Sequence, residues 1–335
     1  MSAAMTAALL GDTLSVVVRS ASAQRLPMLD EALFSLACQR WQKLDVVLAL
    51  QAPDADFLAA AQAVLARQPW REGVSHQVLA VPAAAGFDAR ARLLTEGARV
   101  ARGEFLAFLD DDDIVYQRGY ERLIARLRAR PDAVLAVGGT RLAFLDSVGD
   151  YYFIRRKQDG FFAWGSRRFD LFRDNFIPIH SYVLARTRLP ADLLRFSDEH
   201  VPLEDYEFLL RAATVGPFET SDRLFPVAEY RIHAGNTIWD GEATHATHNP
   251  NLARARELIA RDQKALRMTI TSAEWQELQA TLAPPPAPAG EPVIMAPPGA
   301  HRFLHRRADA VYRLFDRFPR LSNALGALLA RLRGA

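Results

Sequence analysis

The first 140 residues alternate between two patterns of hydrophobic positions. Short, nearly continuous apolar runs typical of buried strands occupy residues 14–18, 44–50, 77–81, 104–109 and 133–137. Segments with apolar residues at helical spacing lie between them, over residues 27–40, 54–67, 89–102 and 116–130. Because strands joined by helical crossovers run parallel and are covered on both faces, we expect an α/β fold with a doubly wound, mostly parallel sheet. Such sheets bind ligands beyond the carboxyl ends of their strands, so functional residues should directly follow strands.

The next part of the chain is less regular. Residues 141–239 are rich in aromatic side chains and predict one clear helix, over 203–213. The aromatic and arginine side chains between 151 and 176 fit a binding surface, and they fit a core with loops equally well.

The C-terminal part combines three patterns. Residues 251–283 predict helix, with Thr271 and Glu274 at the spacing of a capping box. Seven of the fifteen residues in 284–298 are proline, which predicts a semi-rigid linker. Arginines and apolar residues after it alternate at helical spacing, which predicts a basic amphipathic helix. The expected divisions are a domain over 1–240, a helical extension over 241–283, a proline-rich linker over 284–299 and the basic helix over 300–335.

Charge is concentrated in this last helix. Residues 300–335 carry eight Arg and two Asp, so a formal net charge of +2 leaves −4 on the rest, and nucleic acid is not an expected ligand. The basic helix fits an anionic membrane surface, and it fits docking on its own domain or on a partner subunit equally well.

No apolar run reaches the roughly 18 residues that span a bilayer, and residues 1–10 lack the basic start of a signal peptide. We expect a cytoplasmic protein, peripheral on the inner face of the cell membrane if this helix binds lipid. The single cysteine, Cys38, excludes an internal disulfide and a thiolate metal site.

Four consecutive carboxylates, Asp110 to Asp113, follow the run at 104–109. That much negative charge in one turn is costly unless a cation neutralises it, and carboxylate oxygens are the ligands that Mg²⁺ and Mn²⁺ prefer. An acidic turn that caps the helix starting near Tyr116 is the alternative. The position at the end of a parallel strand favours the metal.

Two later groups also carry candidate chemistry. Glu204 and Asp205 open the helix predicted over 203–213, where a carboxylate often serves only as a cap. Arg231, His233 and Asn236 gather beside a glycine, which suits contact with phosphate or metal, although a lone histidine is more often structural.

Taken together and in this order, the three groups resemble family 2 glycosyltransferases of the GT-A fold. Residues 101–113, which end in the four aspartates, are similar to that family's approach to its Asp-x-Asp motif. The stretches 175–181 and 203–207 and the run Tyr230-Arg231-x-His233 resemble its later landmarks. The resemblance covers about residues 15–236.

This resemblance implies an inverting transferase that uses Mn²⁺ or Mg²⁺ to move a sugar from a nucleotide-sugar to a hydroxyl of a glycan or lipid-linked acceptor, in the setting of envelope polysaccharide synthesis. It implies that Asp205 is the general base, with Glu204 as its supporting neighbour. The metal would be held by Asp112 and Asp110 together with His233, and Asp113 would assist. The nucleotide-sugar would meet Ser20, Gln51, Arg90, Asp110 and Asp111, and the acceptor would lie near Trp164, Asn175 and His180.

Two positions depart from the family pattern. The stretch from Gln51 to Asp54 replaces a common Asp-Asp-Gly-Ser turn whose carboxylate reads the base, so UDP, dTDP and GDP donors all stay open. Thr95 stands where Asn is frequent in the family.

A nucleotidyltransferase is a weaker alternative, because it has no use for Asp205 and no glycine-rich phosphate loop lies near the first strand. A non-catalytic binding or scaffold protein that keeps the fold is the alternative from another class.

Overall fold

The computed structural model describes residues 9–148, 151–234, 236 and 250–282. The chain divides into two compact units, residues 1–269 and 270–335, and the second is described only over the helix α7 (Ser272–Leu282) and the residues just before it. The linker and the basic helix expected over 284–335 lie outside the described residues. Within the part of the chain that is described, no helix has the length and apolar character needed to cross a membrane.

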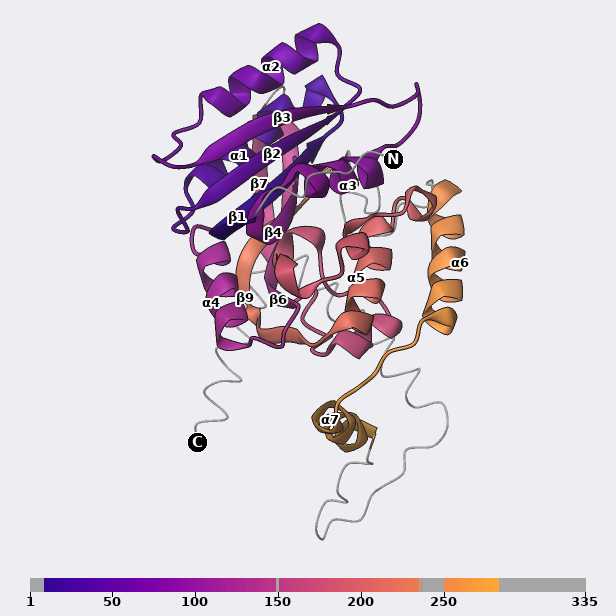
Figure 1. Cartoon of the computed structure of the whole chain (residues 1–335). Helices are drawn as coiled ribbons and strands as arrows, with labels where there is room; N and C mark the ends of the chain where they lie inside the picture. Colours follow the sequence, from indigo (N-terminus) through magenta and orange to yellow (C-terminus); the bar gives the residue numbers. More distant parts are fainter. Residues whose placement is uncertain (1–8, 149–150, 235, 237–249, 283–335) are drawn as a thin grey trace, which may run out of the picture. The chain divides into compact units, whose positions relative to one another are not determined.

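Four strands form the parallel half of the sheet, in the order β3-β2-β1-β4 (Figure 1). They are β1 (Leu10–Ser20), β2 (Leu44–Gln51), β3 (Ser75–Val81) and β4 (Gly103–Asp110). The helices that connect them are α1 (Leu26–Ala37), α2 (Ala55–Ala66) and α3 (Arg90–Val100). The alternating pattern of the first 110 residues is thereby confirmed, and β1, β2 and β4 bring their carboxyl ends to one edge of the sheet.

Beyond β4 the sheet becomes mixed, in the order β8-β6-β9-β5, with β7 paired to β6 outside this path. These strands are β5 (Ile114–Val115), β6 (Leu135–Val148), β7 (Tyr151–Gln158), β8 (Tyr182–Ala185) and β9 (Phe218–Ile232). The strand predicted over 133–137 begins β6, but the antiparallel β8 separates it from β4. The irregular pattern of 141–239 therefore contains strands. Charged residues that pair with other elements interrupt the apolar pattern of β9, as Asp222 does by accepting from Arg122 and Arg126.

The remaining helices are α4 (Gly119–Ala129), α5 (Glu204–Val215) and α6 (Pro250–Ala265). The stretch predicted as helical over 251–283 forms two helices, α6 and α7. The capping box at the start of α7 is confirmed: the Thr271 N–H donates to Glu274 Oε2 at 2.8 Å, and the Glu274 N–H donates to Thr271 Oγ1 at 3.1 Å.

The core lies on both faces of the sheet, and alternate strand residues enter opposite sides. Val16 packs with Leu33 of α1 and Leu123 of α4, whereas its neighbour Val17 packs with Leu94 of α3 and residues of α5. Burial on both faces explains why these strands appear in the sequence as continuous apolar runs.

At Gly97, helix α3 lies close against β1. A Cβ at this position would overlap Val17 Cγ1, whose side chain is itself fully buried. We expect Gly97→Ala to lower the free energy of unfolding by about 1–3 kcal/mol, because the core cannot accept the extra carbon without a shift. Urea denaturation measures the change, with Gly11→Ala as the control because nothing lies within 4 Å of a Cβ there. Equal stability of the two variants would contradict this close approach.

Candidate active site

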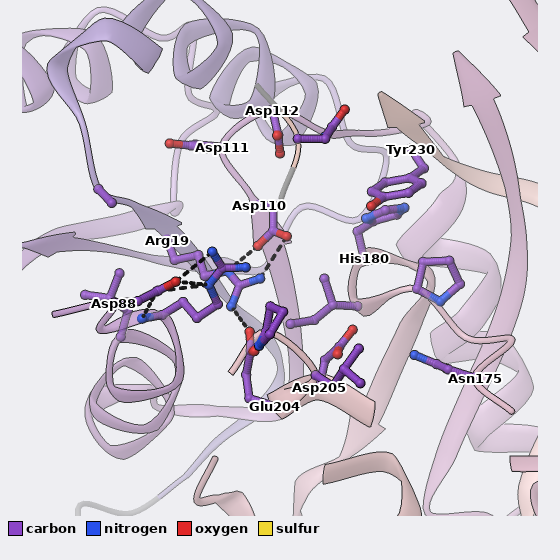
Figure 2. Close-up of a pocket in the computed structure, with 18 of the residues that line it drawn as sticks. Arg19, Asp88, Asp110, Asp111, Asp112, Asn175, His180, Glu204, Asp205 and Tyr230 are labelled. Atoms are coloured by element: carbon purple, nitrogen blue, oxygen red, sulfur yellow. Dashed lines mark hydrogen bonds and ion pairs between the residues drawn. The ribbon is translucent and has the colours of Figure 1, made fainter. Parts of the chain in front are cut away.

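A cavity of about 460 Å³ lies where β1, β2 and β4 end (Figure 2). Other residues of its lining come from the starts of α3 and α5 and from the segment 161–180, and Tyr230 and Asn236 line it as well. Eleven residues predicted for the site line it: Ser20, Gln51, Arg90, Asp110, Asp111, Asp112, Trp164, Asn175, His180, Glu204 and Asp205. The other two, His233 and Asp113, are not part of the lining: His233 Nε2 lies 3.1 Å from Asp112 Oδ2, and Asp113 directly follows Asp112 in the acidic turn. The structure thus brings all the predicted residues together.

The acidic turn after β4 offers a set of cation ligands. Carboxylate oxygens of Asp110, Asp112 and Asp113 all lie within 4.8 Å of one another. Asp113 is fully buried, and it accepts the N–H of Arg231 at 2.7 Å and lies 2.8 Å from His180 Nδ1. An all-oxygen set of this kind fits Mg²⁺ or Mn²⁺.

Three carboxylates of this turn have shifted pKa values. Burial raises the pKa of Asp111 to about 7 and that of Asp113 to about 6. Burial also disfavours the charged form of Asp112, but the hydrogen bond with His233 and the charge of Arg25 outweigh it and lower the pKa of Asp112 to about 2. Asp112 therefore stays ionised across the physiological range, as a metal ligand must.

Two arginines that the sequence analysis did not single out neutralise the turn. Arg19 Nη2 donates to Asp110 Oδ2 at 2.9 Å, its Nε donates to the other oxygen of Asp110, and Nη1 donates to Glu204 (Figure 2). The parallel register of β1 and β4 places Arg19 beside Asp110, so pairing the predicted strands could have found this contact. Arg25 lies with its Nε 3.1 Å from Asp111 Oδ1 and pairs through Nη2 with Asp112.

Asp205 stands in the first turn of α5 and lines the same cavity as the acidic turn (Figure 2). Its Oδ1 accepts the N–H of Tyr206 at 2.7 Å. Burial, followed by the charge of Glu204, raises the pKa of Asp205 to about 7. A carboxylate with such a pKa is suited to take up a proton near neutral pH.

The sequence model of glycosyl transferase family 2 matches residues 21–187, about half of the chain, including β2, β4 and the acidic turn. The chain belongs to glycosyl transferase family 2. A search of curated proteins finds no sequence that matches this glycosyltransferase.

Solved structures agree with the family in fold. This glycosyltransferase is similar to the crystal structure of S. aureus TarS 1-349, with a TM-score of 0.53 and 15% identity over 80% of this chain and 69% of that one. The same TarS fragment in complex with UDP-GlcNAc gives a TM-score of 0.52 and 14% identity over 80% and 71% of the two chains. The match spans 42% of the longer TarS structure. The fold is of the GT-A type.

The loop before α3 forms one side of the glycosyltransferase cavity. The amide of Gln51 donates to the Phe87 carbonyl at 2.8 Å and accepts the Ala89 N–H at 3.0 Å, so this side chain holds the loop in place. Asp88 of that loop lines the cavity and accepts from Arg90 Nε at 2.9 Å. No motif in the sequence had marked Asp88.

The residues expected near the acceptor differ in exposure. Trp164 is 45% exposed and packs its ring edge-on against Phe176, with centroids 5.3 Å apart. Asn175 lines the cavity beside it, and its Oδ1 accepts the N–H of Ile177 at 3.0 Å. His180 is only 1% exposed and pairs with Asp113, which suits support of the acidic turn better than contact with an acceptor. Arg231, singled out for phosphate or metal, pairs with Glu31 at 2.6 Å.

Proposed function

We propose that this glycosyltransferase is an inverting, metal-dependent enzyme that moves a sugar from a nucleotide-sugar to a hydroxyl of a glycan or lipid-linked acceptor. One observation carries the proposal: Asp205 and the acidic turn after β4 line the same cavity, although they come from different elements. A base and a cation site in one cavity meet the two needs of direct displacement at a sugar carbon.

The residues divide these tasks. Asp205 takes the proton from the acceptor hydroxyl as that hydroxyl attacks the anomeric carbon, and attack opposite the leaving group inverts the centre. Asp110, Asp112 and Asp113 would hold Mn²⁺ or Mg²⁺, with His233 in contact with Asp112. When bound, such an ion stabilises negative charge that develops on the leaving diphosphate. Arg19 joins Asp110 to Glu204 and so fixes the distance between the two halves of the site.

The half-exposed Trp164 favours the proposal of a sugar acceptor, because an aromatic face at a cavity rim can pack against the apolar face of a sugar ring.

A role in envelope polysaccharide synthesis, and association with an anionic membrane or a partner subunit through residues 300–335, belong to the same proposal. Deletion of 300–335 tests the last point. If residues 300–335 bind the membrane, the shortened protein should no longer be found in the membrane fraction. Unchanged fractionation would contradict membrane association through this segment.

Nucleotide binding gives the first test. UDP, dTDP and GDP are added separately to the full chain with Mn²⁺, starting with UDP because the TarS fragment was crystallised with it. We expect one of them to raise the melting temperature in a saturable way, since a ligand at a hundredfold excess over its Kd stabilises by about 2.7 kcal/mol. A chelator should abolish the effect. Failure of all three nucleotides, with Mn²⁺ and with Mg²⁺, would contradict the proposal.

The raised pKa of Asp205 predicts a pH dependence. Because the base must be deprotonated, the transfer rate should stay level above its pKa of about 7 and fall about tenfold for each pH unit below it. Initial rates between pH 5 and pH 9, at saturating donor, Mn²⁺ and acceptor, measure this profile. A rate that stays constant from pH 5 to pH 8 would exclude Asp205 as the base.

A further inference from the structure

Arg25 occupies an unusual place in the site. It ends the short turn η1 (Ala23–Arg25), whose backbone is fixed at Ser22, where the side chain accepts the N–H of Gln24 at 3.2 Å. From this anchor its side chain reaches the acidic turn, with Nε 3.1 Å from Asp111 Oδ1 and Nη2 paired with Asp112 Oδ2. The side chain is 32% exposed and lines the cavity.

The guanidinium of Arg25 and a divalent cation at the acidic turn would share the carboxylate of Asp112. Asp112 belongs to the set of three carboxylates that could hold the ion, and its Oδ2 already pairs with Arg25 and lies 3.1 Å from His233 Nε2. Two cations that share one carboxylate repel each other strongly in a buried site. Binding of the ion and pairing of Arg25 with Asp112 therefore oppose each other.

Arg19 is held differently. Its guanidinium lies between Asp110 and Glu204, and its side chain is only 13% exposed. An ion held by Asp110 and Asp112 would also meet Arg19, but Glu204 is not one of the three candidate ligands, so Arg19 keeps this carboxylate as a partner when an ion binds. Arg25 pairs with carboxylates of the acidic turn, is more exposed than Arg19 and lines the cavity, so it is the arginine with room to move.

We propose that Arg25 is a tethered counterion that leaves Asp112 when a divalent cation binds there and then pairs with the diphosphate of the donor. The second step rests on the proposed function. The planar guanidinium fits two phosphate oxygens, and its flexible stem allows a shift while the backbone of η1 stays fixed. The ion and the nucleotide then favour each other's binding, because each makes the other's ligands available.

The first experiment measures Mn²⁺ binding without nucleotide, by calorimetry and by the electron paramagnetic resonance signal of free Mn²⁺. Arg25→Met removes the competing charge and keeps the stem, so we expect Mn²⁺ affinity to rise on the order of tenfold. Arg99→Met is the matched control, because it removes the same charge from an exposed position on α3, with a side chain 67% exposed. Unchanged or weaker Mn²⁺ binding by Arg25→Met would overturn the proposal, as would a failure of both Arg25→Met and the wild type to bind Mn²⁺.

The second experiment measures UDP, GDP and inorganic pyrophosphate at saturating Mn²⁺. Here Arg25→Met should weaken binding of the nucleotide that the wild type prefers, and of pyrophosphate, on the order of tenfold. A purely structural role for Arg25 would shift Mn²⁺ and pyrophosphate affinity in the same direction, whereas the proposal requires opposite directions. Pyrophosphate affinity within twofold of wild type would overturn the second step.

Two further comparisons separate the sources of failure. Arg25→Lys keeps the charge but not the fork, so it should bind Mn²⁺ like the wild type and bind pyrophosphate with intermediate affinity. Circular dichroism of each variant checks the fold. If the wild type binds Mn²⁺ but no nucleotide and no pyrophosphate, the proposed function fails, and the Mn²⁺ titrations alone still decide whether Arg25 competes with the ion.

Discussion

Replacement of Asp205 by Asn should lower the rate of glycosyl transfer by about 10²–10⁴-fold, the usual contribution of a positioned base. The amide keeps the shape of the side chain and its hydrogen bond from the Tyr206 N–H, but it cannot take up a proton from the acceptor. Binding of the nucleotide with Mn²⁺ should persist, because Asp205 is not among the three carboxylates that lie close enough to share an ion. Release of the nucleoside diphosphate measures the rate, and thermal shift measures binding.

The control for this substitution is Asp198→Asn. Asp198 precedes α5, pairs with Arg92 at 3.2 Å, and is not part of the cavity lining, so the same chemical change there should leave the rate close to that of wild type. If Asp205→Asn keeps the full rate, another group must accept the proton. If the wild type binds nucleotide but shows no turnover with any acceptor, the chain is a binding protein with a glycosyltransferase fold.

Asp112→Asn should remove both Mn²⁺ binding and turnover. Among the carboxylates of the acidic turn, Asp112 has a pKa lowered to about 2, and it contacts both His233 and Arg25. Loss of a charge contribution of several kcal/mol to the transition state corresponds to about 10³-fold in rate. Calorimetric titration with Mn²⁺ and turnover assays over a range of Mn²⁺ concentrations measure the two effects.

Asp111→Asn provides the internal comparison. Asp111 is the neighbouring residue and has the same chemistry, but it is not one of the three residues whose oxygens lie within 4.8 Å of one another. Its variant should still bind Mn²⁺. Equal Mn²⁺ affinity of Asp112→Asn and wild type would place the ion elsewhere or remove it from the proposed mechanism.

The sequence predicts the half of the fold whose pattern is set by burial on both sides. Val16 and Val17 enter opposite cores, so β1 appears as a continuous apolar run that is easy to recognise. In β9, buried charged residues such as Glu229, which accepts from Tyr116 and Lys157, take places that a simple strand pattern reserves for apolar side chains. Such charges are satisfied by distant partners, and local periodicity carries no information about them.

The sequence also predicts only part of the site, namely the residues that a local motif marks. The four aspartates and Glu204-Asp205 are local signals, and three of those aspartates line the cavity together with Glu204 and Asp205. Arg19 and Arg25 have no local signal, because their partners are contributed by other elements: Glu204 lies 185 residues after Arg19 in the chain, and Asp112 lies 87 residues after Arg25. Only the register of β1 beside β4 could have linked Arg19 to Asp110 in advance.

Gln51 has a consequence for redesign of the donor preference. Its amide nitrogen and its amide oxygen both bind the backbone, at Phe87 and Ala89. The side chain therefore supports the loop that carries Asp88 and Arg90. Substitution of Gln51 alone would remove both hydrogen bonds that hold the loop. Its first effect would therefore be on the loop, and not on the contacts available to the nucleobase of the proposed donor. Altering the proposed nucleotide-sugar preference therefore calls for replacing Gln51 together with the loop that it holds.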